Sequence, residues 1–158
     1  MIIVRLKAGL GNQLFQYAAG RRLAHHHQCP LKLDIASFAT DRLRRYGLSA
    51  FNIHEDFAND DDLQMVRGVP RSRVGRIWFR LTECLKPGYR RRILEDLTLG
   101  QYDERILKTP QNVYLNGYWQ SERYFSGIQA TLRRELTFKH PYKGCSAILE
   151  SVLHSPAS

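Results

Sequence analysis

The start of this chain combines a buried-strand pattern, a turn with two glycines and the pattern of an amphipathic helix. Residues 2–6 are mostly apolar and begin with β-branched side chains, which is typical of a buried strand. Gly9 and Gly11 bracket the turn, and apolar residues then recur at helical spacing from Phe15 to Leu23. A strand, a glycine turn and a helix in this order present backbone N–H groups and a helix dipole to a phosphate. This feature predicts an α/β fold with a nucleotide or sugar-nucleotide site at its first turn.

A second strand pattern follows the helix at residues 31–34, after Pro30. Two strands joined through a helix form a parallel pair with a right-handed crossover. The chain has 158 residues, of which 43% are hydrophobic, so one domain with a real core is expected. We therefore predict an α/β fold with a Rossmann-like parallel sheet and flanking helices.

The rest of the chain alternates between loops and shorter patterns. Residues 35–60 read mostly as loop, with a few aromatic and aliphatic anchors. We expect further helices at residues 60–67, 74–85, 121–136 and 147–153, and a further strand at residues 113–118.

The positive charge is concentrated in one segment. The formal net charge is +9, and residues 67–92 contribute +8 of it, with nine basic residues and one acid. Such a local field attracts phosphates of nucleic acids, lipid headgroups or nucleotides. Trp78 and Phe79 lie on or beside the apolar stripe of the predicted helix, so they do not form a stacking platform for bases. We expect peripheral contact with an anionic membrane through this segment and no nucleic-acid binding.

Several familiar sites are not supported. The dinucleotide-binding pattern fails because Leu14 stands at its third glycine position, although Asp34 lies about where a ribose-binding acid would be. His25, His26 and His27 are consecutive on a helix and face different directions, so they do not form a metal site. The three cysteines lack the spacing of a zinc site or a disulfide framework, which favours a reducing, cytoplasmic compartment.

A second cluster of polar and aromatic residues follows the strand predicted at residues 113–118. It contains Tyr118, Trp119, Gln120 and Glu122, at the end of the strand where open α/β sheets bind ligands. Aromatic faces beside amide and carboxylate groups suit a sugar, which offers both C–H surface and hydroxyls. The alternative is that the aromatic members of this cluster are core residues.

Together these segments resemble the α-1,2-fucosyltransferases of glycosyltransferase family 11. The stretch at residues 7–21 is similar to the N-terminal signature of that family, and residues 117–125 look like its central motif. Residues 33–34, 45–48 and 51–53 follow in the order of the family. The resemblance implies the N-terminal lobe of a GT-B-like enzyme that transfers fucose from GDP-fucose to the 2-hydroxyl of a galactose with inversion. It also implies a role in surface-polysaccharide synthesis at the cytoplasmic side of the inner membrane.

The resemblance assigns roles to individual residues. Gly9, Gly11 and Asn12 would face the donor GDP-fucose, and Gln13 would support their turn. The wall of the site for a galactose-terminated glycan acceptor would include three residues of the second motif: Tyr118, Trp119 and Gln120. Glu122 and Asp34 are the candidates for a general base. No cofactor and no obligatory metal are implied.

One part of the family pattern does not occur in this sequence. The family grips the donor diphosphate with a motif His-x-Arg-Arg-Gly-Asp-Tyr, and no segment here matches it. We therefore expect residues 1–140 to form the acceptor-side lobe and residues 141–158 to be a truncated tail that leads towards a missing donor lobe. On this reading the chain is inactive alone. The alternatives are an inactive remnant that binds a glycan or nucleotide, and a basic nucleic-acid-binding protein.

Overall fold

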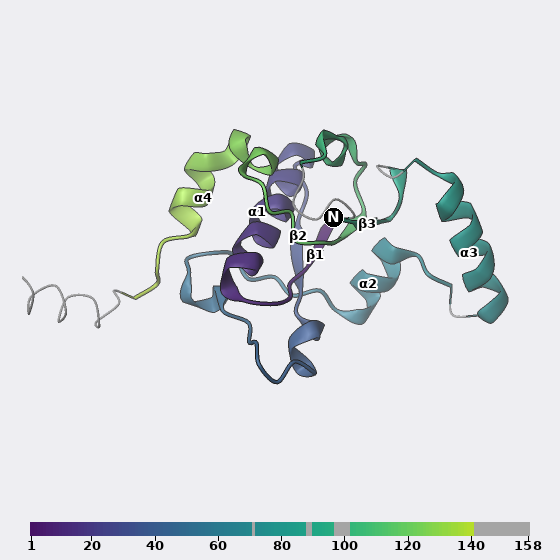
Figure 1. The fold of residues 1–158 in the computed structure, drawn as a ribbon, viewed down its shortest axis with the longest axis horizontal. Coiled ribbons are helices and arrows are strands. Elements are labelled where there is room, and N and C mark those ends of the chain that lie inside the picture. Colours follow the sequence, from purple (N-terminus) through teal and green to yellow (C-terminus); the bar gives the residue numbers. More distant parts are fainter. Residues whose placement is uncertain (71, 88–89, 97–101, 141–158) are drawn as a thin grey trace, which may run out of the picture.

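The computed structural model of the chain describes residues 1–70, 72–87, 90–96 and 102–140 (Figure 1). Four parallel strands form one sheet in the order β2-β1-β4-β3. Their bounds are Ile2–Arg5 for β1, Leu31–Asp34 for β2, Ile93–Glu95 for β3 and Val113–Asn116 for β4. This arrangement confirms the predicted α/β class, and the pairing of β1 with β2 confirms that these two strands are parallel neighbours.

Strand β1 is apolar on both sides because both faces of the sheet are covered. Ile2 and Val4 belong to the main core, whereas Ile3 belongs to a smaller cluster with Val66 and Tyr114. Helix α1 (Leu10–His27) packs on β1 and β2 at the main core. A Cβ atom on Gly20 would lie 2.9 Å from Leu31 Cδ1 and 3.1 Å from Val4 Cβ, so this glycine lets the helix approach the sheet closely.

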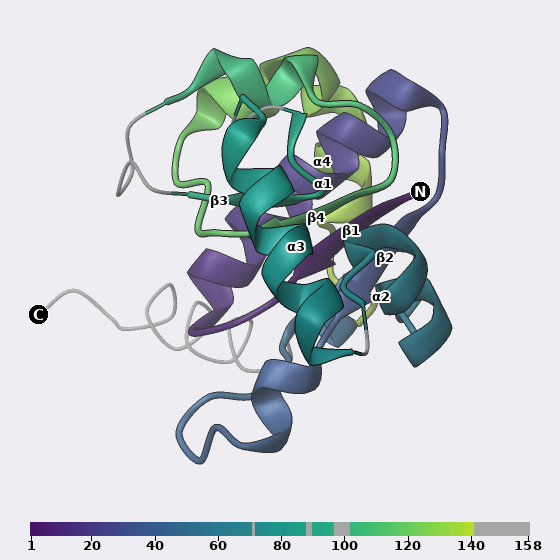
Figure 2. The same ribbon diagram turned by 90° about the vertical axis from the view of Figure 1, so that its right-hand side faces the viewer.

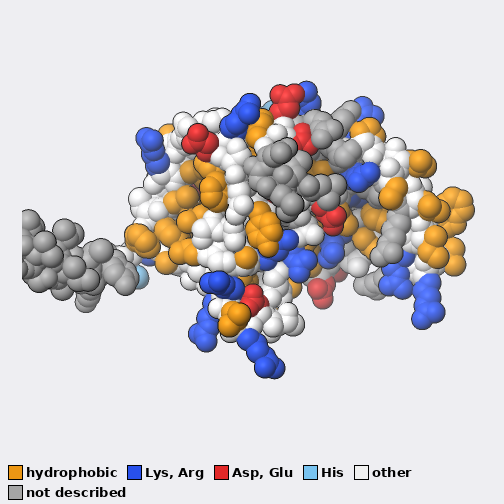
Figure 3. Space-filling model, viewed as in Figure 1, with side chains coloured by type: hydrophobic (Ala, Val, Ile, Leu, Met, Phe, Trp, Pro, Cys, Tyr) orange, Lys and Arg blue, Asp and Glu red, His pale blue; other side chains and the backbone are white. Residues whose placement is uncertain are grey.

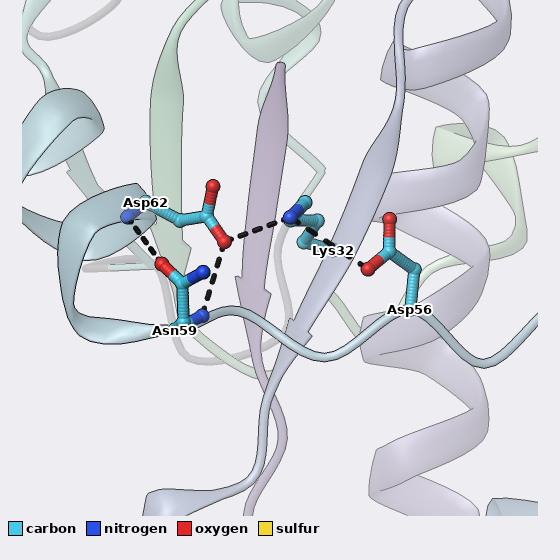
Figure 4. A network of polar contacts seen from close by, with 4 residues as sticks. All are labelled: Lys32, Asp56, Asn59 and Asp62. Carbon is cyan, nitrogen blue, oxygen red and sulfur yellow. Dashed lines mark hydrogen bonds and ion pairs between the residues drawn. The ribbon is translucent and has the colours of Figure 1, made fainter.

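Helix α2 (Asp60–Arg67) covers the other face of the sheet and confirms the short helix predicted there. Its first turn is fixed by a capping box: Asn59 Oδ1 accepts a hydrogen bond from Asp62 N at 2.8 Å, and Asp62 Oδ2 accepts one from Asn59 N at 3.0 Å (Figure 4). Lys32 on β2 joins this network with its Nζ 2.8 Å from Asp62 Oδ2 and 3.7 Å from Asp56 Oδ1. The hydrogen bond from Lys32 holds the pKa of the Asp62 carboxyl below its usual value.

Helix α3 (Arg73–Leu85) confirms the helix predicted at residues 74–85. It stands at the side of the molecule, away from α1 and α4 (Figures 1 and 2). Five apolar side chains along it are exposed, whereas α1 buries apolar side chains such as Tyr17 and Leu23.

The segment after β4 differs from the expectation of one continuous helix over residues 121–136. Two 3₁₀ turns, Glu122–Tyr124 and Ser126–Ile128, precede a shorter helix α4 at Gln129–Glu135. Phe125 and Ile128 both have φ near −130°, which interrupts a regular helix at each of them.

Helix α4 is joined to α1 by a polar contact. Glu135 Oε2 accepts a hydrogen bond from the Tyr17 hydroxyl at 2.7 Å, and Glu135 Oε1 lies 2.9 Å from Arg21 Nη2. Burial and the neighbouring carboxylate raise the pKa of Tyr17.

Strand β3 was not predicted, because it has three residues and directly follows a run of arginines. The helix expected at residues 147–153 lies outside the described residues. Among the helices that the structure describes, none has the length and apolar character needed to span a bilayer.

Candidate functional site

The two motifs singled out in the sequence meet at the carboxyl ends of the two central strands. Because β1 and β4 are paired in parallel, the residues that leave them emerge side by side. Lys7 Nζ donates a hydrogen bond to Asn116 Oδ1 at 3.2 Å and lies 4.8 Å from the centre of the Tyr118 ring. Asn12 Oδ1 accepts a hydrogen bond from Gln120 Nε2 at 2.6 Å. We call these five residues the polar cluster: Lys7, Asn12, Asn116, Tyr118 and Gln120.

The glycine turn owes its sharp bend to an alanine. Ala8 has φ of 66°, in the left-handed region, whereas Gly9 has φ of −72° and ψ of 167°. A Cβ atom on Gly11 would meet no described atom within 4 Å, and one on Gly9 would lie 3.9 Å from Arg44 Nη1. Neither glycine therefore has a backbone conformation or a close described neighbour that excludes a side chain. At Gly11 the space beside the start of the helix is open.

The start of α1 has the properties of an anion-binding helix end. The first N–H groups of a helix have no acceptor within the helix, and Gly9 at the N-cap provides no side chain to accept from them. The first turn of α1 contains no acidic residue. Lys7 adds a positive charge just before this turn. A negatively charged group would thus be stabilised by the dipole and by the ammonium.

Gln13 fixes the turn between β1 and α1 through its side chain. Its buried side chain donates from Nε2 to Ala8 O at 3.0 Å and to Arg45 O at 2.9 Å, and its Oε1 accepts from Gly47 N at 2.9 Å. All three hydrogen bonds run to backbone atoms, so the amide is fully used within the protein. Gln13 therefore supports the turn, as the resemblance implies, and it positions the site without offering an atom to a ligand.

Lys7 and Asn116 are candidate site residues that the sequence reasoning did not single out. Burial and the nearby charge of Arg5 lower the pKa of Lys7, and the acids Glu95 and Asp96 act in the opposite direction. They could have been identified from their positions in the sequence, because Lys7 follows β1 closely and Asn116 is the last residue of β4. Polar residues at the carboxyl ends of parallel strands are expected to converge.

Trp119 lies in the core, which is the alternative that the sequence left open. Its ring is buried and meets the Tyr124 ring edge to face at 5.8 Å. Its φ of 53° and a hydrogen bond from Trp119 N to Asp96 Oδ2 at 3.1 Å fix the backbone of this turn. Tyr118 keeps its ring at the surface above Lys7, and Glu122 is exposed in the following 3₁₀ turn.

Asp34 has a structural role. Its carboxylate is buried and accepts hydrogen bonds from Ala36 N at 2.9 Å and from the Tyr114 hydroxyl at 2.6 Å. Tyr114 belongs to the core cluster on the α2 side of the sheet, so the carboxylate points away from the α1 side. Burial, followed by the contact with Asp34, raises the pKa of Tyr114. Because both carboxylate oxygens are engaged, we do not retain Asp34 as a candidate base.

Other features of the described residues lie apart from the polar cluster. No group of three or more His, Cys, Asp or Glu side chains in the described ranges is arranged to hold a metal ion. His27, one of the three consecutive histidines, has its Nε2 2.7 Å from Thr109 O. An apolar groove of about 470 Å³ lies between α1 and α4, lined by side chains such as Leu14, Phe15 and Leu132. Most of its lining is apolar, with Gln129 and Arg133 as its polar members, and none of the polar cluster lines it.

Comparison with known proteins gives one informative similarity. No protein-family model matches the chain. No solved structure matches it either. The chain is similar to a protein of Escherichia coli described as an alpha-1,2-colitosyltransferase, with 29% identity over 139 residues. The matched region is 87% of this chain and 45% of that relative, so the chain spans less than half the length of the relative.

Proposed function

We propose that this chain is the acceptor-side lobe of a glycosyltransferase that uses a sugar nucleotide. The observation that carries the proposal is the meeting of the two motifs at the carboxyl ends of β1 and β4, through the contacts Lys7–Tyr118 and Asn12–Gln120, with Asn116 beside them. The site combines an open helix N-terminus and an ammonium, which suit a diphosphate, with three side-chain amides, which suit sugar hydroxyls.

The E. coli relative supports the class of reaction. Its name describes glycosyl transfer in an α-1,2 linkage, and its similarity extends over most of this chain. The resemblance to α-1,2-fucosyltransferases leads to the same linkage with a different sugar. We propose GDP-fucose as the donor and the 2-hydroxyl of a galactose-terminated glycan as the acceptor, and a colitosyl donor is the alternative.

The residues of the site would contribute to an inverting transfer in distinct ways. Negative charge grows on the diphosphate as its bond to the anomeric carbon breaks and the acceptor oxygen attacks that carbon, and the N–H groups of α1 and the Lys7 ammonium would stabilise this charge. Asn12 and Gln120 would donate and accept hydrogen bonds with hydroxyls. Gln13 would keep the turn rigid, and Glu122 is the remaining candidate for the base that takes the acceptor proton.

We further propose that the complete reaction needs a second lobe. The resemblance implies an arginine-rich motif for the diphosphate, and this motif would belong to the part of the relative's length that the present chain does not span. In this proposal residues 1–140 bind the acceptor and one side of the donor, and residues 141–158 lead towards the donor lobe.

Ligand binding by the 158-residue chain tests this function. Titration calorimetry with GDP-fucose, GDP and a β-galactoside should detect binding, and UDP-glucose should compete weakly. Asn12→Ala and Lys7→Gln should weaken GDP-fucose binding by about tenfold each, which corresponds to about 1.4 kcal/mol. Asn52→Ala is the matched control, because its Nδ2 contacts Thr137 Oγ1 at the surface.

Two results would count against the proposal. Absence of binding to every one of these ligands would contradict the sugar-nucleotide site. Rapid fucosyl transfer from GDP-fucose to lactose by this chain alone would contradict the need for a second lobe.

A further inference from the structure

Helix α3 presents an apolar face to solvent. Five side chains on it are between 56% and 87% exposed: Val74, Ile77, Trp78, Leu81 and Leu85. They recur at spacings of three and four residues, so they form a single stripe along the helix. In the space-filling view, hydrophobic side chains gather at the end of the molecule where α3 lies, with Lys and Arg side chains beside them (Figure 3). An exposed stripe of this kind marks an interaction surface.

The helix is stabilised by local contacts at both ends. Ser72 Oγ accepts a hydrogen bond from Gly75 N at 3.0 Å, which satisfies an N–H group of the first turn. Arg91 donates from Nη2 to Cys84 O and from Nε to Lys86 O, both at 3.3 Å, at the other end. The apolar stripe takes no part in either contact, so the helix can form while this face stays open.

Exposed basic side chains lie beside the stripe. Arg73 and Arg76 are exposed and lie off the stripe, and residues 67–92 together contribute +8 to the charge of the chain. The helix has 13 residues, about 20 Å in length, which is too short to cross a bilayer but suits a helix lying in its surface. Interfacial helices combine an apolar face that contains Trp or Leu with basic residues on the polar side.

We propose that α3 docks the protein onto an anionic lipid bilayer, with its apolar stripe at the boundary between headgroups and acyl chains and its arginines on lipid phosphates. Lipid phosphates attract the basic side chains, and the stripe enters the boundary of the acyl chains. This proposal does not depend on the glycosyltransferase assignment, because it uses no residue of the polar cluster.

The chemistry of the stripe favours a membrane over other partners. A nucleic acid would contact the arginines but would leave Ile77, Leu81 and Leu85 in water. A second copy of the chain would bring two strongly positive segments together, and like charges repel. An anionic bilayer is complementary to both the charge and the apolar face.

Vesicle co-sedimentation of the 158-residue chain tests the proposal. The chain should sediment with vesicles of equal parts phosphatidylglycerol and phosphatidylethanolamine, and should not sediment with pure phosphatidylcholine. Binding should weaken as salt is raised. Trp78 fluorescence should shift to the blue and be quenched by brominated lipids, whereas Trp119 is already buried. Trp78→Phe should abolish the fluorescence change.

Two double variants separate the apolar and electrostatic contributions. Ile77→Ser with Leu81→Ser should weaken vesicle binding at least tenfold, because the stripe loses apolar area. The matched control is Leu43→Ser with Met65→Ser, two exposed apolar residues outside α3, and it should change binding less than twofold.

Charge reversal is tested in the same way. Arg73→Glu with Arg76→Glu should weaken binding at least tenfold. Arg42→Glu with Arg134→Glu makes the same change in net charge on exposed residues elsewhere, and it should cause a smaller loss. Near-ultraviolet circular dichroism checks that every variant is folded.

Several outcomes would overturn the proposal. They are failure of the wild-type chain to sediment with phosphatidylglycerol vesicles, and equal losses in test and control variants. A dimer in size-exclusion chromatography that disappears in the Ile77→Ser and Leu81→Ser variant would identify a second copy as the partner. RNA binding that requires Arg73 and Arg76, with no lipid binding, would identify a nucleic acid.

Discussion

Helices α1 and α3 follow similar sequence patterns and have opposite surroundings. Each has apolar residues at helical spacing and each forms where the pattern predicts. Much of α1 is buried, including the polar Gln13 and Gln16. The apolar stripe of α3 is exposed. This is so although the apolar and polar faces of α3 are more clearly separated than those of α1. The difference teaches that periodicity predicts a helix but does not identify what its apolar face will contact.

Among the paired substitutions proposed here, leucine to alanine in each helix should give the largest difference in the free energy of unfolding. Leu23→Ala in α1 removes a fully buried side chain and should lower the free energy of unfolding by about 2–5 kcal/mol. Leu81→Ala in α3 should change it by less than about 0.5 kcal/mol, because that side chain is already exposed. Urea unfolding followed by circular dichroism measures both. Similar losses would show that the stripe of α3 is buried in solution.

Removing a side-chain hydrogen bond should also lower stability more in α1 than in α3. Gln13→Ala removes three buried contacts to backbone atoms and should cost about 3 kcal/mol. Thr82→Ala in α3 removes one exposed contact to Phe79 O and should change stability by less than about 0.5 kcal/mol. A small effect of Gln13→Ala on urea unfolding would contradict the role of this residue in holding the turn.

Removing a helix cap should give a smaller difference in stability, here between α2, which packs on the sheet, and α3. Asn59→Ala removes the cap of α2, which packs on the sheet, and should lower the free energy of unfolding by about 1 kcal/mol. Ser72→Ala removes the contact at the start of α3 and should mainly reduce helix content by circular dichroism, because α3 contributes little to the core. If both variants lower global stability equally, α3 is more tightly coupled to the fold than the structure indicates.

The capping box of α2 also predicts a dependence on pH, with the smallest effect. The pKa of Asp62 is lower in the folded chain than its ordinary value near 3.8, so its contribution to stability is present above that value. The contribution is lost as the pH falls through the lowered pKa. Asp62→Asn should therefore show a weaker loss of stability than the wild type between about pH 4 and pH 2. The matched variant Asp61→Asn, on the exposed side of α2, should behave like the wild type.

Much of the fold could be predicted because hydrophobic patterning is strong where burial is complete. Strands β1 and β2 with helix α1 were identified because their apolar residues are contiguous or helically spaced. Strand β3 has three residues beside arginines, and its place in the sheet depends on pairing with β4, which is not encoded locally. The helix predicted from residue 121 is interrupted because tertiary contacts, such as Asp103 N to the Tyr124 hydroxyl at 2.9 Å, fix that segment.

The candidate site was predicted in part. The meeting of Asn12 with Gln120 follows from strand ends that can be inferred from sequence. The burial of Trp119 and of the Asp34 carboxylate could not be inferred, because the direction of a side chain at the end of a strand depends on one residue of register. The left-handed conformation of Ala8, next to Gly9, could not be inferred from the sequence either.

The Gln13 contacts constrain where insertions and deletions can be accepted during the evolution of this chain. Surface loops are ordinarily the places where chains gain or lose residues with little penalty. The loop at residues 45–47 is an exception, because one amide fastens it to the turn before α1. Insertions should accumulate a few positions earlier, around exposed Leu43, while the tethered stretch keeps its length.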